Sequence, residues 1–324
     1  MSETRDPRPR RRRPFRTAVG LLVLIAVIGY FAVQRYSNGG AGAPYCTATA
    51  TASGSDGTVQ RYEMTPEQAA NAATIAAVGI SKGLPDRAVT IALATAMQES
   101  ALRNLDHGDR DSLGLFQQRP SQGWGTPEQI RDPVYSAGIF YDHLVDVPGY
   151  SRLPLTVAAQ KVQRSGFPQA YAKHETDATV LTAAFGEGGT PATLSCSGPA
   201  PQPGNPDKVR EELARAFGKD ALTGSRDGAA TGHKGSDRAT ETEVNLQLKR
   251  DGGAGEARRG RAMAHWAVAR SQELGIARVS YDRSAWIAGS GRGQWQVKGG
   301  NGAKDGDGDP HNSGPDEVRI FIAR

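Results

Sequence analysis

The sequence predicts a mainly α domain followed by a smaller α+β domain, both behind one N-terminal transmembrane helix. Three observations lead to this fold class: an uncharged apolar run near the N-terminus, a series of helical signals over residues 64–194, and a mixed helix and strand pattern beyond residue 206. The 324 residues suffice for about two domains with cores of their own. We expect these domains at residues 61–197 and 207–324.

The first element, the apolar run, covers residues 17–34 and contains no charged side chain. A helix of this length spans about 27 Å, close to the ~30 Å hydrocarbon core of a bilayer. Because basic flanks stay in the cytoplasm, residues 1–16 are predicted to be a cytoplasmic tail and residues 17–34 a single-pass cell-membrane anchor, with the bulk of the chain extracytoplasmic. The alternative is secretion after cleavage of a signal peptide near residues 41–43.

The positive charge of the chain is concentrated in the predicted tail. The 39 Lys and Arg residues outnumber the 34 Asp and Glu residues by five, and residues 1–16 alone hold seven Arg against Glu3 and Asp6. The rest of the chain is therefore neutral overall. A basic nucleic-acid-binding domain does not fit this distribution, so we expect no nucleic acid among the partners.

Cys46 and Cys196 are the two cysteines of the chain. In an oxidising compartment such a pair favours a disulfide over a metal site, which needs four ligands or nearby histidines. We therefore predict a Cys46–Cys196 disulfide that closes the first domain, and no metal or other cofactor. Residues 35–60 are small and polar and are predicted to be a tether, while residues 198–206 are a Pro-rich linker.

Helix signals dominate the first domain. Residues 65–68 and 126–129 both read Thr-Pro-Glu-Gln, which combines a Thr N-cap, Pro at the first helical position and Gln three residues after the cap. Residues 88–102 are apolar on nearly every side until Gln98, which is typical of a buried helix. Further helices are expected over residues 155–164 and 168–185, and no strand pattern stands out.

The pattern changes after the linker. Helical segments alternate there with short runs of β-branched and apolar residues, which indicates an α+β domain with a small core. The expected helices are 207–217 and 262–274, and the expected strands are 242–248, 278–281, 294–297 and 318–323.

Glu99 is the strongest candidate for chemistry. It lies one turn from the end of the buried helix, where apolar neighbours and the negative end of the helix dipole both disfavour its charged form. A carboxyl that keeps its proton near neutral pH is what a general acid requires. The alternative is an exposed Glu at a helix end, or one paired with Arg103.

Residues 99–100 (Glu-Ser) are followed at residues 114–117 by Gly-Leu-Phe-Gln. This pair resembles the Glu-Ser and Gly-Leu-Met-Gln signature of lytic transglycosylases and goose-type lysozymes, and the Gly-Asp-Arg at residues 108–110 resembles a segment of the goose-type enzymes. The resemblance covers about residues 61–195. It implies a lysozyme-like domain in which a short hairpin faces the Glu across a cleft, and it implies that peptidoglycan glycan strands are cleaved there.

The resemblance assigns roles to several residues. Glu99 is expected to protonate the glycosidic oxygen, Ser100 to orient Glu99, and Gln117 to line the cleft. The other expected substrate-binding residues are Phe116, which stands where the family has Met, Trp124 and Tyr171. Trp124 and Tyr171 also fit the plain role of partly or fully buried aromatic residues.

The sequence departs from the goose-type pattern at the second carboxylate, because Arg119 occupies its position. Asp109 and Asp111 are the nearby candidates for a base that activates water in a hydrolase, and both also fit turn capping or ion pairing. Without such a base, Glu99 serves as acid and then as base while the 6-hydroxyl of the substrate attacks, as in lytic transglycosylases.

The C-terminal region resembles the end of zinc D-alanyl-D-alanine carboxypeptidases of the VanY type. That family finishes with Asp-His-Val-His, whereas residues 316–319 read Asp-Glu-Val-Arg, and Asn245 stands where the family has Asp. The resemblance therefore implies a degenerate peptidase-like domain that lacks its metal ligands.

Three functions remain open from the sequence. The first is lytic transglycosylase-like cleavage of peptidoglycan with Glu99 as the single catalytic carboxylate. The second is a non-catalytic wall-binding or scaffold protein, and the third is a muramidase that uses Asp109 or Asp111. The expected partners are peptidoglycan and, through residues 17–34, the cytoplasmic membrane; the sequence indicates no protein partner.

Overall fold

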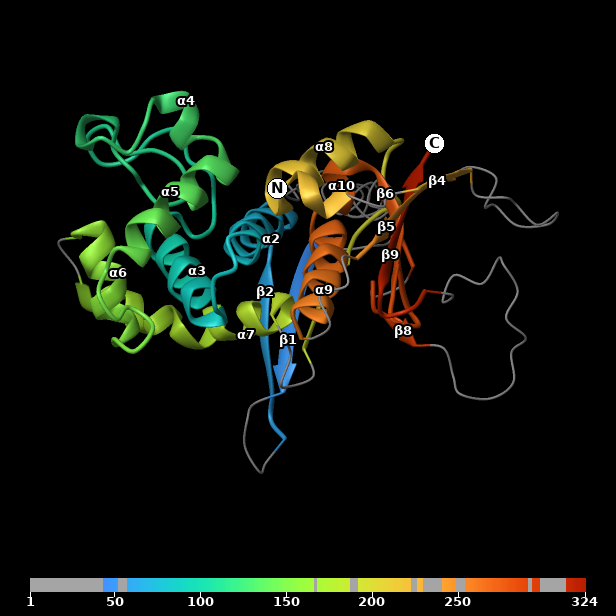
Figure 1. Ribbon diagram of the computed structural model, residues 1–324, viewed down its shortest axis with the longest axis horizontal. Helices are drawn as coiled ribbons and strands as arrows, with labels where there is room; N and C mark the ends of the chain where they lie inside the picture. Colours follow the sequence, from blue (N-terminus) through green and yellow to red (C-terminus); the bar gives the residue numbers. More distant parts are fainter. Residues whose placement is uncertain are drawn as a thin grey trace, which may run out of the picture. The chain divides into compact units, whose positions relative to one another are not determined.

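The computed structural model describes residues 43–51, 57–165, 168–186, 192–222, 226–229, 241–248, 254–290, 293–297 and 313–324. Pro44–Arg324 form one compact unit (Figure 1). Its helices are α2 (Pro66–Ser81), α3 (Asp86–Ser100), α4 (Pro127–Ile130), α5 (Pro133–Val145), α6 (Leu155–Gln163), α7 (Glu175–Phe185), α8 (Pro206–Phe217), α9 (Ala254–Ala269) and α10 (Ser271–Leu274), with short 3-10 turns η1 (Pro120–Gln122), η2 (Pro168–His174) and η3 (Lys219–Leu222).

The helix starts follow the sequence signals. Both Thr-Pro-Glu-Gln segments form capping boxes, at the start of α2 and of α4, in which the Thr hydroxyl accepts from the Gln backbone N–H and the Gln side chain accepts from the Thr N–H. Helix α3 is buried from Ala88 to Met97 and packs against α2 and α7. The predicted capping boxes and buried helix are confirmed.

A three-stranded antiparallel sheet lies where the sequence predicts a tether and a mainly α domain in which no strand pattern stands out. Its strands are β1 (Tyr45–Thr51), β2 (Val59–Met64) and β3 (Ala192–Ser197), in the order β2-β1-β3. The prediction is wrong here because the inward side chains of β1 are as small as Ala48 and Ala50, so its alternation resembles a flexible polar segment. Its partner β3 is also far away in the sequence, so only the tertiary fold completes the sheet.

The Cys46–Cys196 disulfide is confirmed. The two cysteines face each other as direct neighbours of the β1–β3 pair, with their Cα atoms 4.0 Å apart. The bond closes a loop of the chain over a sequence separation of 150 residues. It therefore fixes the first strand of the small sheet to the last.

A second antiparallel sheet forms the C-terminal region. Its six strands follow the order β4-β5-β9-β6-β7-β8 and comprise β4 (Arg226–Ala229), β5 (Glu241–Gln247), β6 (Ile276–Tyr281), β7 (Ser284–Ile287), β8 (Gln296–Val297) and β9 (Glu317–Ala323). Helix α9 packs against β6 and β9 and also contacts β3, so it lies between the two sheets (Figure 1). The helix expected over residues 262–274 is split at Arg270 into α9 and α10.

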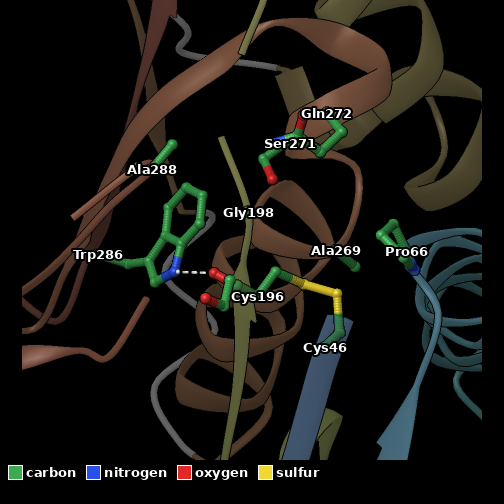
Figure 2. A pocket seen from close by; sticks show the side chains of 11 residues that line it. Cys46, Pro66, Cys196, Gly198, Ala269, Ser271, Gln272, Trp286 and Ala288 are labelled. Carbon is green, nitrogen blue, oxygen red and sulfur yellow. Dashed lines mark hydrogen bonds between the residues drawn. A yellow bond between two sulfur atoms is a disulfide. The ribbon is translucent and has the colours of Figure 1, made fainter. Parts of the chain in front are cut away.

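Buried polar contacts join the C-terminal region to the helical region. The Trp286 indole N–H donates to the Cys196 carbonyl at 3.2 Å, beside the disulfide (Figure 2), and the Trp295 indole N–H donates to the Leu194 carbonyl at 2.9 Å. His265 on α9 hydrogen-bonds the Ala184 carbonyl at 2.6 Å. These contacts make residues 192–197 the shared boundary of both regions. The division into domains 61–197 and 207–324 stays a prediction.

The membrane helix of the predicted fold class has no counterpart among the described helices. Residues 17–34 lie outside the described part of the chain, and within that part no helix is both long and apolar enough to cross a membrane. The longest described helices, α2 and α9, have 16 residues each, below the ~20 that a span requires. No described element therefore supports the predicted single-pass placement in the cell membrane.

The disulfide gives a stability prediction. In the Cys46→Ser/Cys196→Ser variant the unfolded chain regains the freedom that the closed loop removes, so the free energy of unfolding should fall by about 2–5 kcal/mol. Denaturant unfolding monitored by circular dichroism measures the difference. Equal unfolding midpoints for the variant and the oxidised wild type would contradict this account, and reduction of the wild type is the matched control.

Candidate active site

Glu99 lies at the last turn of α3, where this buried helix reaches the surface. The helix stops after Ser100 because Ala101 and Leu102 both take left-handed conformations, with φ of 53° and 60°. The Leu102 side chain is fully buried, which holds this reversal in place. The end of α3 therefore presents Glu99 at a fixed position, half-buried among its neighbours.

Ser100 fastens the end of α3 to the loop that follows. Its hydroxyl donates to the Leu115 carbonyl at 2.8 Å and to the Ala96 carbonyl at 3.1 Å. Ser100 is predicted to orient Glu99, whereas these two bonds go to backbone carbonyls. Ser100 thus holds the loop around Leu115 in place.

That loop is a tight turn with a short antiparallel bridge. Leu113 and Gln118 exchange backbone hydrogen bonds at 2.9 and 3.0 Å around residues 114–117. Gly114 has φ of +74°, and a Cβ there would approach the Ile130 carbonyl oxygen to 2.6 Å, so only glycine fits. The Gln117 side chain lines the cleft and is held by the Ser112 hydroxyl at 2.9 Å.

Phe116 lies in the core instead of the cleft. Its side chain is fully buried and stacks on Phe140 with ring centroids 4.5 Å apart. Its carbonyl accepts from the Gln163 side chain at 2.7 Å. Phe116 therefore attaches the turn to the core, and its ring has no exposed surface that could contact a substrate.

Tyr171 and Glu99 are direct partners. The Tyr171 hydroxyl, on the 3-10 turn η2, donates to Glu99 Oε1 at 2.7 Å, and its ring is fully buried. Gln163, at the end of α6, also hydrogen-bonds the Glu99 carboxyl, and Ser165 hydrogen-bonds the Tyr171 hydroxyl. Three segments far apart in the sequence therefore converge on one carboxyl.

Burial raises the pKa of the Glu99 carboxyl above its ordinary value of 4.5, while the hydrogen bonds from Tyr171 and Gln163 oppose this rise. Burial, followed by the negative charge of Glu99, raises the pKa of the Tyr171 hydroxyl as well. Tyr171 therefore stays a hydrogen-bond donor at physiological pH. The site holds a carboxyl that keeps its proton to higher pH than an exposed glutamate.

Glu99 lines a cleft of about 910 Å³. The lining comes from the end of α3, the segment 109–124, and the C-terminal ends of α5 and α6. Trp124 lines it beside His143, with ring centroids 4.4 Å apart and planes tilted by 49°. An aromatic surface next to polar side chains is suited to the apolar faces and hydroxyls of a sugar.

Asp109 and Asp111, the two candidate bases, have different surroundings. Asp109 lines the cleft and is almost fully exposed, with Arg110 4.0 Å away. Asp111 accepts from Arg119 Nε at 2.7 Å and from the Ser121 N–H at 2.9 Å. The hydrogen bonds from Ser121 and Arg119 lower the pKa of Asp111, so its carboxylate is fully engaged.

Gln163 and Asp146 are cleft residues that no sequence pattern predicts. Gln163 contacts both the turn and Glu99, and Asp146 adds a carboxylate from the end of α5. Neither stands in a motif, because a single polar residue at a helix end is common on any surface. Their distance from Glu99 in the sequence left no spacing signal.

The described residues contain no group of three His, Cys, Asp or Glu side chains that is arranged to hold a metal ion. Within the C-terminal sheet, the Gln247 side chain donates to Asn245 Oδ1 at 3.0 Å and to Glu317 Oε2 at 2.9 Å. Arg319 pairs with Glu243 through two bonds of 2.6 and 3.0 Å. The strand positions at which the carboxypeptidase resemblance implies metal ligands thus carry the Asn245 amide, the Glu317 carboxylate and Arg319, and each is hydrogen-bonded to a neighbouring side chain.

No protein-family model matches the chain, and no curated protein sequence gives a significant match. Functional inference therefore depends on the chemistry of the cleft.

The raised pKa of Glu99 predicts a pH-dependent effect on stability. Below its unfolded-state pKa, near 4.5, the folded and unfolded chains are both protonated at this site. As the pH rises through the higher folded-state pKa, the wild type loses stability because the unfolded chain releases this proton more readily. Gln at this position does not titrate. The free energy of unfolding of Glu99→Gln, relative to the wild type, should therefore increase as the pH rises above 4.5 and then become constant. Denaturant titrations of both proteins across pH 4–8 measure it; a gain that is constant with pH contradicts the buried-carboxyl assignment.

Proposed function

We propose that the chain cleaves the glycan strands of peptidoglycan in this cleft, with Glu99 as the general acid. The observation that carries the proposal is the half-buried Glu99 carboxyl, hydrogen-bonded by the buried Tyr171 at the base of a cleft of about 910 Å³. The Glu-Ser and Gly-Leu-Phe-Gln segments, which resemble those of lytic transglycosylases, meet there through the Ser100–Leu115 hydrogen bond. A carboxyl that keeps its proton is the group that a glycosidic oxygen needs in order to leave.

In the proposed reaction the neutral Glu99 donates its proton to the oxygen that links N-acetylmuramic acid to the next sugar, and the C1–O bond breaks. The resulting Glu99 carboxylate then accepts the proton of the 6-hydroxyl on the same muramic acid as that oxygen attacks C1. The products are a 1,6-anhydro ring and a free 4-hydroxyl. Tyr171 and Gln163 hydrogen-bond the carboxyl and so support its charged state between the two steps.

The transglycosylase route needs only the Glu99 carboxylate. An inverting hydrolase needs a second carboxylate about 6.5–9.5 Å away to activate water. Asp111 is engaged with Arg119 and Ser121 and is not in the cleft lining. Hydrolysis with Asp109 is the second candidate, since Asp109 lines the cleft and its carboxylate is exposed.

The proposed binding surface for the sugars combines Trp124, beside His143, with the Gln117 amide. A purely wall-binding protein would use the same surface without needing an acid. The raised pKa of Glu99 supports the catalytic function, because a carboxyl whose pKa is raised by burial beside a cleft is a candidate general acid. For residues 207–324 we propose a non-catalytic role, supported by Asn245, Glu317 and Arg319 at the positions of the missing ligands and by their hydrogen bonds to neighbouring side chains.

Glu99→Gln should abolish cleavage of purified peptidoglycan. The amide keeps the shape and the hydrogen bonds of the carboxyl but has no proton to deliver, and general acid catalysis contributes about 10²–10⁴-fold. Release of soluble muropeptides, separated by chromatography, measures the rate. Retained binding to sedimented walls is the folding control. Cleavage at the wild-type rate by this variant would remove the proposed enzymatic function, as would the absence of cleavage by the wild type.

The reaction type is tested by the products and by the two aspartates. For a transglycosylase, mass spectrometry should show 1,6-anhydromuropeptides, and Asp109→Asn and Asp111→Asn should each keep the rate within about threefold of the wild type, since neither supplies a base. Products with a free reducing end, together with a large loss of rate in Asp109→Asn alone, would indicate the hydrolase instead.

A further inference from the structure

The last turn of α6 adds two cations to the cleft. Lys161 and Arg164 belong to the lining and are exposed. In the part of the chain that the structure describes, neither has a carboxylate within 4.0 Å. They flank Gln163, which hydrogen-bonds Glu99 and the carbonyl of the neighbouring turn. The two charges therefore lie at the wall next to the reacting carboxyl.

The other charges of the cleft do not cancel this pair. The two further arginines of the lining each have an aspartate partner, Arg110 with Asp109 at 4.0 Å and Arg119 with Asp111 at 2.7 Å. Asp146, at the end of α5, and Glu99 are the lining carboxylates that have no cation partner among the described residues. Neither lies within 4.0 Å of Lys161 or Arg164, so this helix end presents two unpaired cations to a negatively charged ligand.

The backbone at Arg164 adds an independent observation. Arg164 ends α6 in the left-handed conformation, with φ of 52° and ψ of 38°, and its N–H donates to the Gln160 carbonyl. Glycine adopts this conformation without strain, whereas a residue with a Cβ does not. The chain holds an arginine where a glycine is less strained, and this arginine belongs to the cleft lining.

The chemistry of the substrate identifies the anion. The glycan backbone of peptidoglycan is uncharged, but each N-acetylmuramic acid carries on its lactyl group a peptide with free carboxylates. In the proposed reaction the muramic acid lies next to the last turn of α6, because Gln163 joins that turn to Glu99. We propose that Lys161 and Arg164 bind a carboxylate of this stem peptide and so select peptide-bearing strands. This inference rests on the proposed function.

The test compares two forms of one substrate: soluble glycan strands with intact stem peptides, and the same strands after their peptide carboxylates have been converted to amides. The wild type should show a KM about tenfold higher on the amidated strands, with kcat unchanged, because two charge-assisted contacts are lost on binding. In Lys161→Gln/Arg164→Gln the KM for the intact strands should rise to that level, and amidation should then have no effect. Arg164→Lys keeps the charge, so this variant should retain part of the difference in KM between intact and amidated strands.

Arg152→Gln is the matched control, since it removes one exposed cation that is not part of the cleft lining. Strands are compared before and after hydrofluoric acid treatment, which removes phosphate-linked polymers. A KM that rises after that treatment, but not after amidation, would assign the site to phosphate and overturn the proposal. So would equal KM values of the wild type on intact and amidated strands.

Binding of both strand forms to Glu99→Gln, with and without the two cation substitutions, separates this inference from the proposed function. If the wild type cleaves but amidation changes neither KM nor binding, the peptide site is wrong and the enzymatic function stands. If the wild type cleaves nothing, while binding to Glu99→Gln depends on the carboxylates and on the two cations, the peptide site stands and the enzymatic function is wrong.

Discussion

The enclosure of α3 is the constraint on which the rest of the site depends. Other elements surround this helix from Ala88 to Met97, and it meets solvent at its first and last turns. The next two residues reverse the chain in left-handed conformations, and Leu102 is buried at once. Glu99 is therefore held at the border between core and cleft. Its chemistry follows from that border position, since full exposure or full burial would each remove a usable proton.

Opposing effects on Glu99 balance each other at this border. Burial favours the neutral carboxyl, whereas the hydrogen bonds from Tyr171 and Gln163 favour the carboxylate. A group that must give a proton and take one back benefits from both, because neither state is then strongly disfavoured. The same balance explains why Tyr171 is buried, since a solvated hydroxyl exchanges its hydrogen bond with water more easily.

The C-terminal region contributes to this site through packing. Arg258 on α9 is buried and donates to the Leu84 carbonyl and to Asp86 at the first turn of α3, at 2.9 and 2.7 Å. The same helix contacts α2 and α7, which are the neighbours of α3. The C-terminal region thus supports the helix that carries Glu99 from its far end. A structural role of this kind needs no metal ligands.

The sequence by itself determined the local elements of this protein: the two capping boxes, the buried helix that ends at Glu99, and the disulfide. Each follows from neighbouring residues or, for the disulfide, from the presence of two cysteines alone. The small sheet was missed because Ala48 and Ala50 carry too little apolar surface to mark a strand, and its pairing joins residues about 140 positions apart. Only the tertiary structure brought Tyr171 and Gln163 to Glu99, turned Phe116 into the core and engaged Asp111 with Arg119. These contacts are set by how helices and turns pack across the whole unit, and no local pattern records that packing.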